Sequence, residues 1–401
     1  MRPSPRAIET RERLKQLATR QAAAVSVTAA PGDLAELARL QWAVGQVDAA
    51  EASFRRSLAA RADARVARSL AGLLYWRGRY VEAASVARAW RIEPGAEPGQ
   101  AWLRQLLAMT ASSPSAPAGQ SPQAALPGLE LTAVPGGTWN RGADDELANE
   151  WPLRSVAVSQ FEIGTYEITV GQYREFLRRS GYASEDDDWV WLRDPTRHAH
   201  PATGISWWDA RAFTIWLSAA TGDVYRLPTE AEWEWAARGV TGRLHPWGPV
   251  RGDPQEYGNW GRTSWGDLRE GVPQTSPVGS VVRDRSPFGI ADMGGNAAEW
   301  CLDAYDATYY EWARSADPYG PVNDEGGRVL RGWSFRAPGS GRGAAVDRTG
   351  YEVRQAYSMF GFRVVRESRA TSPPPRTPPA ADARRPARGA RATRDRGSRR
   401  R

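Results

Sequence analysis

Tryptophan is concentrated in one part of the chain, and this concentration limits how that part can fold. Fifteen of the 19 tryptophans lie between Trp139 and Trp333. Glycine is also frequent there, and short apolar runs are separated by turn residues. Such a region favours short elements and loops that pack through aromatic rings, or an aromatic-rich binding surface.

Composition divides the 401 residues into five segments. We expect an N-terminal extension (residues 1–32), an all-α helical domain (33–108) and a linker rich in Pro, Ser and Ala (109–128). An α+β domain rich in Gly and Trp (129–367) and a disordered tail (368–401) follow. The tail holds eleven arginines, two aspartates and no aromatic residue, so it cannot bury a core.

The charge and the cysteine content indicate the environment of the protein. The tail carries a net charge of +9 against +7 for the whole chain, so the rest is close to neutral. Contact with nucleic acid is therefore expected only through the tail, and a solvated tail is the alternative. No apolar run is long enough for a membrane span or a secretory signal, and the single cysteine fits a reducing compartment. The sequence predicts a cytoplasmic protein.

The helical segment contains an internal repeat. Leu37, Leu40, Trp42, Gly45, Val47, Ala50 and Phe54 recur 33 residues later as Leu70, Leu73, Tyr75, Gly78, Tyr80, Ala83 and Ala87. The pattern resembles two tetratricopeptide repeats, and a plain helical hairpin is the alternative. Because about three repeats are needed for an independent stack, we expect a protein partner or the next domain to cover this unit.

The segment from 129 to 366 carries eight motifs. In chain order they are VPGGTW (134–139), FEIGTYEITVGQYREFL (161–177), GISWWDARAFTIWL (204–217), RLPTEAEWEWAARG (226–239), HPWG (245–248), SPFGIADMGGNAAEW (286–300), RVLRGWS (328–334) and GFRVV (361–365). Three of them predict helices that end at Gly181, Gly222 and Gly239. Thr229 with Glu232 three residues on predicts a capping box.

In order and spacing, these motifs resemble the formylglycine-generating enzyme family, also called the sulfatase-modifying factor domain. The resemblance implies a C-type-lectin-like fold with many long loops. Enzymes of this family oxidise a substrate cysteine to formylglycine with two cysteines that bind copper. Those cysteines would stand at Ala337 and Arg342 here, and neither side chain replaces a thiolate. The one thiol, Cys301, is expected in the core. The sequence therefore predicts no copper and no formylglycine production.

The family also carries two structural calcium ions. By resemblance, one ion would bind Asp292, the carbonyls of Gly295 and Ala297, and Glu299. The other would bind Asn259, the Trp260 carbonyl, Glu270 and the Val272 carbonyl. Carboxylate, amide and carbonyl oxygens are the ligands that Ca²⁺ takes. The alternative at both sites is that these side chains cap turns.

A non-haem iron centre is a further alternative, because other relatives with this fold hold iron through histidines and a carboxylate. His198 and His200 stand beside Asp194, and His245 is the third histidine of the chain. Packing roles for these histidines are the competing interpretation.

The residues that occupy the family's active-site region predict a binding cleft. It would comprise Trp333, Ser334, Arg336, Arg342 and Tyr351, and such Arg and aromatic residues are frequent in binding hot spots. Three functions follow as hypotheses. The first is a non-catalytic module (a pseudoenzyme) that holds a peptide or small ligand in the cleft and a protein partner on the repeats. The second is an iron-dependent oxidoreductase. The third is a diversified lectin-like binder, although Ser340–Phe360 lacks the asparagines typical of such segments.

Overall fold

The structure is a computed structural model. It describes residues 30–95, 101–112, 125–143, 149–184, 190–249, 256–260, 274–320, 327–336 and 345–367, together with Glu9, Glu12, Arg13 and Gln16. The tail 368–401, most of the expected linker and nearly all of the N-terminal extension lie outside these residues.

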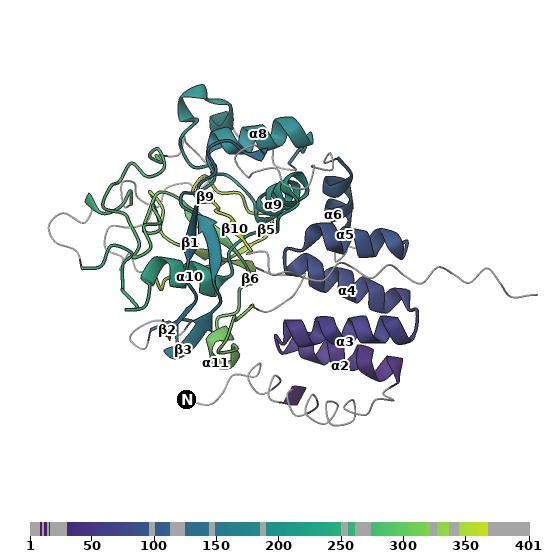
Figure 1. Ribbon diagram of the computed structural model, residues 1–401. Coiled ribbons are helices and arrows are strands. Elements are labelled where there is room, and N and C mark those ends of the chain that lie inside the picture. The colour runs from purple at the N-terminus through teal and green to yellow at the C-terminus, as the bar shows by residue number, and fades with distance from the viewer. Residues whose placement is uncertain are drawn as a thin grey trace, which may run out of the picture. The chain divides into compact units, whose positions relative to one another are not determined.

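In the part of the N-terminal region that the structure describes, there are five helices. They are α2 (Pro31–Ala43), α3 (Val47–Ala60), α4 (Ala64–Trp76), α5 (Tyr80–Ala89) and α6 (Ala101–Ser112). Of these, α2 to α5 lie side by side in one stack, and α6 runs across its end (Figure 1). Asp63 caps α4 by accepting a hydrogen bond from the N–H of Arg65 at 2.8 Å. The last helix of this part, α6, ends four residues beyond the boundary expected at 108.

The two repeats have the same turn at equivalent positions. Gly45 joins α2 to α3 with φ of 77°, and Gly78 joins α4 to α5 with φ of 79°. L-amino acids with side chains rarely adopt this left-handed conformation, so glycine is needed at both turns. The repeated small residues Ala50 and Ala83 are fully buried. The described helices are thus consistent with helical repeats.

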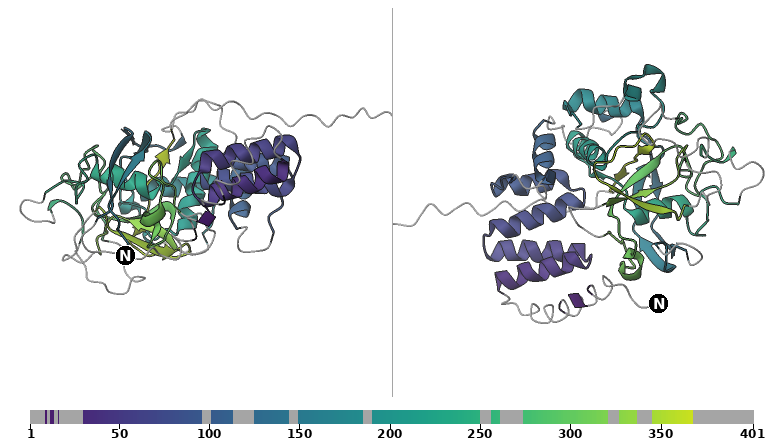
Figure 2. Two further views of the ribbon diagram at one scale, coloured as in Figure 1. Left: turned by 90° about the horizontal axis from the view of Figure 1, so that it is seen from below. Right: turned by 180° about the vertical axis from the view of Figure 1, so that it is seen from behind.

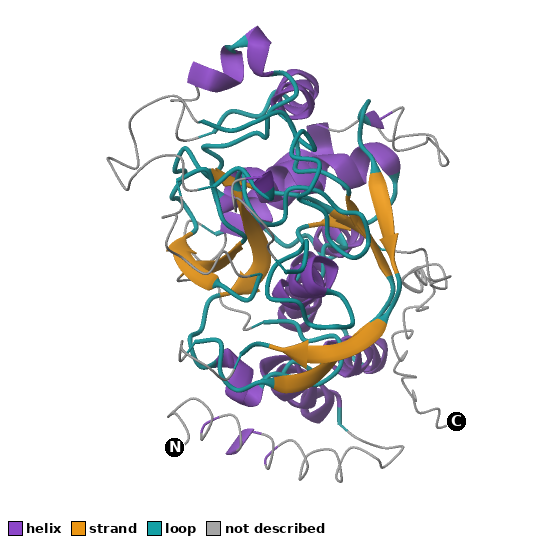
Figure 3. Cartoon of the chain, turned by 90° about the vertical axis from the view of Figure 1, so that its left-hand side faces the viewer, coloured by secondary structure: helices purple, strands orange, loops and turns teal. Residues whose placement is uncertain are grey.

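The second part is a mixed α+β domain in which loops connect short elements (Figure 3). Its strands are β1 (Leu131–Val134), β2 (Gly137–Arg141), β3 (Arg154–Val158), β4 (Phe161–Gly164), β5 (Tyr225–Arg226), β6 (Ala298–Ala304), β7 (Gly327–Arg331), β8 (Arg348–Glu352), β9 (Phe360–Gly361) and β10 (Val365–Arg366). One sheet has the order β1-β4-β10-β5, a second pairs β2 with β3, and a third has the order β8-β7-β6-β9. The β6–β9 pair is parallel, and the other pairs are antiparallel.

The helices expected in this domain form where the sequence places them. They are α8 (Val170–Ser180), α9 (Trp207–Thr221) and α10 (Glu230–Arg238), and each begins with a capping box and ends at the expected glycine. Short elements complete the domain: η2 (Val190–Arg193), η3 (Pro195–Arg197) and α11 (Tyr309–Trp312). The capping box predicted at Thr229 and Glu232 is confirmed.

The helical stack and the α+β domain share one hydrophobic core within residues 1–368. Figure 2 shows the two parts next to each other in two further views. Trp76 at the end of α4 stacks on Trp207 at the start of α9, with ring centroids 5.8 Å apart and planes at 28°. The Arg211 guanidinium lies over both of these rings and donates to the carbonyl of Tyr75 at 3.0 Å. The next domain therefore covers the helical stack, as the shortage of repeats predicts.

The glycine turns of the repeats also contact the domain. A Cβ on Gly78 would lie 2.6 Å from the Cβ of Arg226, and one on Gly45 would lie 3.3 Å from Cδ of Arg314. The equivalent turns of the two repeats thus meet two arginines of the domain. Within the described ranges, no helix has both the length and the apolar character that a membrane span requires.

Candidate functional site

Three residues of the expected cleft follow β7 directly. Trp333 is half-buried, its indole N–H donates to the Oδ2 of Asp347 at 2.6 Å, and its ring meets that of Trp260 edge-on at 5.6 Å. Ser334 and Arg336 are only 5 % and 8 % exposed, and the N–H of Arg336 donates to the Ser334 hydroxyl at 3.2 Å. This turn therefore presents mainly Trp333 to solvent.

Tyr351 lies at the other end of the same strand pair. In the β7–β8 register it is opposite Arg328, whereas Arg348 is opposite Arg331, the last residue of β7 before the turn that carries Trp333. Its ring packs against Phe360 at 4.7 Å, and burial raises the pKa of the Tyr351 hydroxyl. The structure brings Trp333, Ser334 and Arg336 together but does not bring Tyr351 to them.

The positions of the family's copper ligands, Ala337 and Arg342, lie outside the described residues. Cys301 lies in the middle of β6 and is fully buried, as the sequence predicts. Burial, together with the neighbouring Asp303, raises the pKa of this thiol well above its usual value. Because the thiolate is the metal-binding and reactive form, Cys301 is poorly suited to either role.

Glu299, an expected calcium ligand, forms a buried ion pair. The guanidinium of Arg363 donates to both of its carboxylate oxygens at 2.6 Å, and the indole N–H of Trp233 donates to Oε2 at 2.9 Å. These three bonds occupy the main acceptor positions of the carboxylate. Its charge is therefore compensated without a metal ion, and a role in packing accounts for its burial.

Around Asp292 the balance of charge is different. Burial raises the pKa of Asp292 to about 6, although its Oδ2 accepts from the N–H of Gly279 at 2.5 Å. Burial and the charge of Asp292 also raise the pKa values of Glu167 and Asp284 well above their usual range. Acidic side chains are therefore buried here in excess of the two cations, Arg285 and Arg363, that act on them. A carboxylate such as that of Asp292 is a ligand that Ca²⁺ takes.

Asn259 belongs to the other expected calcium site and has an unsatisfied oxygen. Its Nδ2 donates to the carbonyl of Gln274 at 3.1 Å and to Oδ1 of Asn296 at 3.2 Å, while its own buried Oδ1 has no hydrogen-bond partner. A buried amide oxygen without a donor suits a cation. Glu270 and Val272, the remaining ligands expected at this site, lie outside the described residues.

Asn296 joins the two expected calcium sites, although it is not among the ligands predicted from the sequence. Its Nδ2 donates to Oε2 of Glu167 at 2.9 Å, and its Oδ1 accepts from Asn259. Its φ of 70° is a conformation that asparagine tolerates better than most residues. In the sequence, two features could have identified Asn296 as part of this site. They are the tolerance of asparagine for this conformation and its place between Gly295 and Ala297.

The histidines have packing roles. His198 lies on Gly171, where an added Cβ would be 2.2 Å from its ring, and Nδ1 of His200 bonds the Thr275 hydroxyl at 3.0 Å. Asp194 caps the N–H and hydroxyl of Thr196. His245 stacks on Trp247 at 5.4 Å. Among the described residues, no three His, Cys, Asp or Glu side chains are arranged to hold a metal ion.

A buried network of charges lies beneath the turn that carries Trp333. The Glu230 carboxylate of α10 accepts from Arg348 at 2.6 Å and lies 3.0 Å from the Arg141 guanidinium, while Arg331 bonds Glu234 at 2.8 Å. Burial alone would raise the pKa of Glu230, but Arg348, Arg141 and Arg331 outweigh it and lower the pKa to about 2. This network fixes β7 and β8 to α10.

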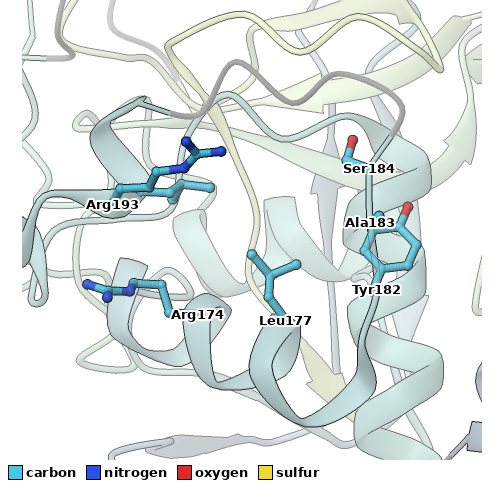
Figure 4. A pocket seen from close by; sticks show the side chains of 7 residues that line it. Arg174, Leu177, Tyr182, Ala183, Ser184 and Arg193 are labelled. Carbon is cyan, nitrogen blue, oxygen red and sulfur yellow. The ribbon is translucent and has the colours of Figure 1, made fainter.

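Three cavities in the described part of the chain are lined by other residues. One of about 220 Å³ lies at the end of α8, where Arg174 and Arg193 lie to one side, Tyr182 and Ser184 to the other, and Leu177 between them (Figure 4). A second, of about 470 Å³, lies between α6 and the start of α9. The third, of about 590 Å³, lies between the α2–α3 turn and the segment that follows α11. Trp333, Ser334, Arg336 and Tyr351 line none of these three.

Residues 117–368 match the family described as the sulfatase-modifying factor enzyme 1-like domain, which includes the formylglycine-generating enzymes. The match covers more than half of the chain, so the chain belongs to this family. The α+β fold and the helical part that precedes it agree with the expectation from the sequence.

Individual relatives show the extent of the similarity. The chain is 30 % identical over 285 residues to the bovine (Bos taurus) protein named inactive C-alpha-formylglycine-generating enzyme 2. This alignment covers 59 % of the chain and 87 % of the bovine protein. The chain is 28 % identical over 325 residues to the formylglycine-generating enzyme of Streptomyces coelicolor, covering 66 % and 98 %. Among solved structures, PvdO from Pseudomonas aeruginosa is 26 % identical with a TM-score of 0.49, covering 60 % of this chain and 95 % of that one.

Proposed function

We propose that this chain is a non-catalytic member of the family, which holds a peptide or small ligand at the turn carrying Trp333, Ser334 and Arg336. One observation carries the proposal. The chain has a single cysteine, and that cysteine is fully buried in β6. Two soft thiolate ligands cannot be assembled from one buried thiol, so the family's copper chemistry has no ligands here.

The relatives support this proposal. The bovine protein and its mouse (Mus musculus) counterpart, 31 % identical to this chain, are both named inactive formylglycine-generating enzymes. The family fold therefore occurs in proteins named for the absence of the activity. A half-buried tryptophan with its indole bonded to Asp347, beside the ring of Trp260, suits ligand contact rather than bond cleavage.

We also propose calcium as a structural ion. One ion would bind Asp292, the carbonyls of Gly295 and Ala297, and Glu299, which would contribute less because Arg363 already occupies its oxygens. A second ion would bind Asn259, the carbonyl of Trp260, Glu270 and the carbonyl of Val272. When bound, the ions would neutralise buried carboxylate charge. The chain's own residues then keep the loops on either side of Asn296 in place.

A protein partner on the helical stack and a cytoplasmic location remain parts of the proposal. The stack already contacts the α+β domain through its glycine turns and through Trp76, so a partner would bind its remaining faces. The single cysteine supports a reducing compartment. The tail, outside the described residues, would add only a non-specific attraction to polyanions.

The experiment compares the chain with a variant in which the missing ligands are restored. The natural protein and A337C/R342C are incubated with copper and a peptide containing the cysteine that the family's enzymes oxidise, and products are followed by mass spectrometry. We expect no formylglycine from the natural chain. Binding of the same peptide, measured by calorimetry, should weaken in W333A but not in W151A, which removes a tryptophan that is 37 % exposed elsewhere. Formylglycine from the natural chain would overturn the proposal.

A further inference from the structure

The largest of the three cavities is a crevice in which the helical stack meets the α+β domain. Its volume is about 590 Å³. Gln46 and Asp48 line it from the start of α3, and Arg154, Trp312 and Arg314 line it from the domain. None of these residues belongs to the turn with Trp333 or to the expected calcium sites.

Two arginines of the crevice arise from neighbouring backbone positions. Ala157 of β3 forms a parallel bridge with Ala316, and its N–H donates to the carbonyl of Ser315 at 2.7 Å. This bridge holds the segment that follows α11 alongside β3, so residues from both segments line the crevice. Arg154 and Arg314 are both half-buried, and both line the same crevice.

Neither guanidinium is neutralised by a carboxylate within the described part of the chain. Nη1 of Arg154 donates to the carbonyl of Tyr310 at 2.8 Å, and Nη1 of Arg314 donates to the carbonyl of Gly45 at 2.6 Å. The one carboxylate that lines the crevice, Asp48, pairs with Arg77 at 2.7 Å. Burial, with the charge of Arg141, lowers the pKa of Arg154, as expected for a cation that lacks an anion.

Trp312 adds an apolar surface and a donor to the same crevice. Its indole N–H is buried and has no hydrogen-bond partner, and its ring packs edge-on against Tyr309 at 4.9 Å. Guanidinium groups present a planar fork of donors that matches a carboxylate, and an indole beside them favours a ligand with some carbon framework. A space of this size exceeds what a single inorganic anion fills.

We propose that this crevice is a binding site for a carboxylate ligand, held by Arg154 and Arg314 against Trp312. The ligand is either a small dicarboxylic acid or the acidic side chains of a peptide segment, since both offer the same chemistry. The site is separate from the proposed cleft, and because its walls belong to both parts of the chain, a bound carboxylate would also tie the helical stack to the domain.

The test is calorimetric titration of the full chain with succinate and, separately, with a tetraglutamate peptide. The matched variants are R154Q, which removes a cation from the crevice, and R39Q, which removes one from the exposed face of α2. The tail contributes eleven arginines to every variant, so its attraction cancels in the comparison. We expect R154Q to weaken binding roughly tenfold and R39Q to leave it unchanged.

Further arms make every outcome decisive. Binding of succinate, with or without binding of tetraglutamate, indicates a small acid, and binding of tetraglutamate alone indicates an acidic segment. R154K keeps the charge but not the planar fork, so an intermediate affinity supports the proposal and covers the case in which R154Q fails to fold. If neither probe binds, or if R154Q and R39Q weaken binding equally, the proposal is wrong.

Discussion

Trp76 and Trp207 stack across the boundary between the helical stack and the α+β domain, with their ring centroids 5.8 Å apart. Arg328 on β7 lies over both rings, at 4.6 Å from Trp76 and 4.4 Å from Trp207. The residue pair therefore connects α4, α9 and the strand that leads to Trp333. The helical part of this chain therefore packs against the α+β domain through buried side chains.

Removing this stack should destabilise both parts together. We expect W76A to lower the free energy of unfolding by roughly 3–5 kcal/mol, because a buried ring is lost and Arg211 and Arg328 each lose one of the rings they lie over. Differential scanning calorimetry should show a single transition that shifts as a whole, and W151A should shift it little. Two separate transitions, with only one moving in W76A, would show that the parts are independent.

Glu230 should be needed for stability. E230Q leaves Arg141 and Arg348 buried without their shared carboxylate, so we expect a loss of roughly 3–5 kcal/mol in urea unfolding. E162Q is the control, since Glu162 pairs with Arg366 in a half-exposed bridge worth less than about 1 kcal/mol. Equal losses in the two variants would contradict this role for the network.

The same network makes the stability of the folded state depend on pH. The pKa of Glu230 falls from 4.5 to about 2 on folding, so the folded state binds fewer protons than the unfolded state between these values. Its contribution is complete above pH 4.5 and is lost as the pH falls toward 2. The free energy of unfolding, measured in urea between pH 7 and pH 3, should therefore fall below about pH 4.5, and it should fall less in E230Q. An unchanged fall in that variant would assign the acid sensitivity elsewhere.

Calcium should stabilise the protein. Relative to EGTA, calcium at a hundred times its dissociation constant should add about 2.7 kcal/mol, seen as a rise in Tm. D292N should reduce this rise, and D33N, on the exposed start of α2, should not. If calcium and magnesium shift Tm equally in both variants, the buried carboxylates around Asp292 bind no specific ion.

Cys301 should be chemically silent in the folded state. It is fully buried, and burial raises the pKa of its thiol, so a thiol reagent such as Ellman's reagent should modify it only after the chain unfolds. Labelling in guanidinium chloride provides the positive control. Rapid reaction of the native protein would show an accessible thiol and would reopen a redox role.

Much of this fold could be predicted because its signals are local. Thr229 with Glu232, and the glycines at 181, 222 and 239, determine helix ends within a few residues of chain, so the three helices followed from the sequence. Family motifs supplied the rest of the domain. The burial of Cys301 could be predicted from its place after Glu299 and Trp300.

The remainder depends on contacts between distant residues. The residues next to Arg363 in the sequence do not show that its guanidinium pairs with Glu299. This ion pair compensates the charge of a residue that the sequence predicts as a calcium ligand. Tyr351 follows Trp333 closely in sequence, yet the register of β7 and β8 separates the two along the strand pair. The crevice at Arg154 and Arg314 depends on a parallel bridge between segments more than 150 residues apart.

Because its single cysteine is buried, we expect that this chain holds no copper centre. Inductively coupled plasma mass spectrometry on the full chain, loaded with copper and then dialysed, tests it most directly. We expect calcium, but neither copper nor iron, in stoichiometric amount. Stoichiometric copper or iron would contradict this expectation and would direct the first substitutions to His198, His200 and Cys301.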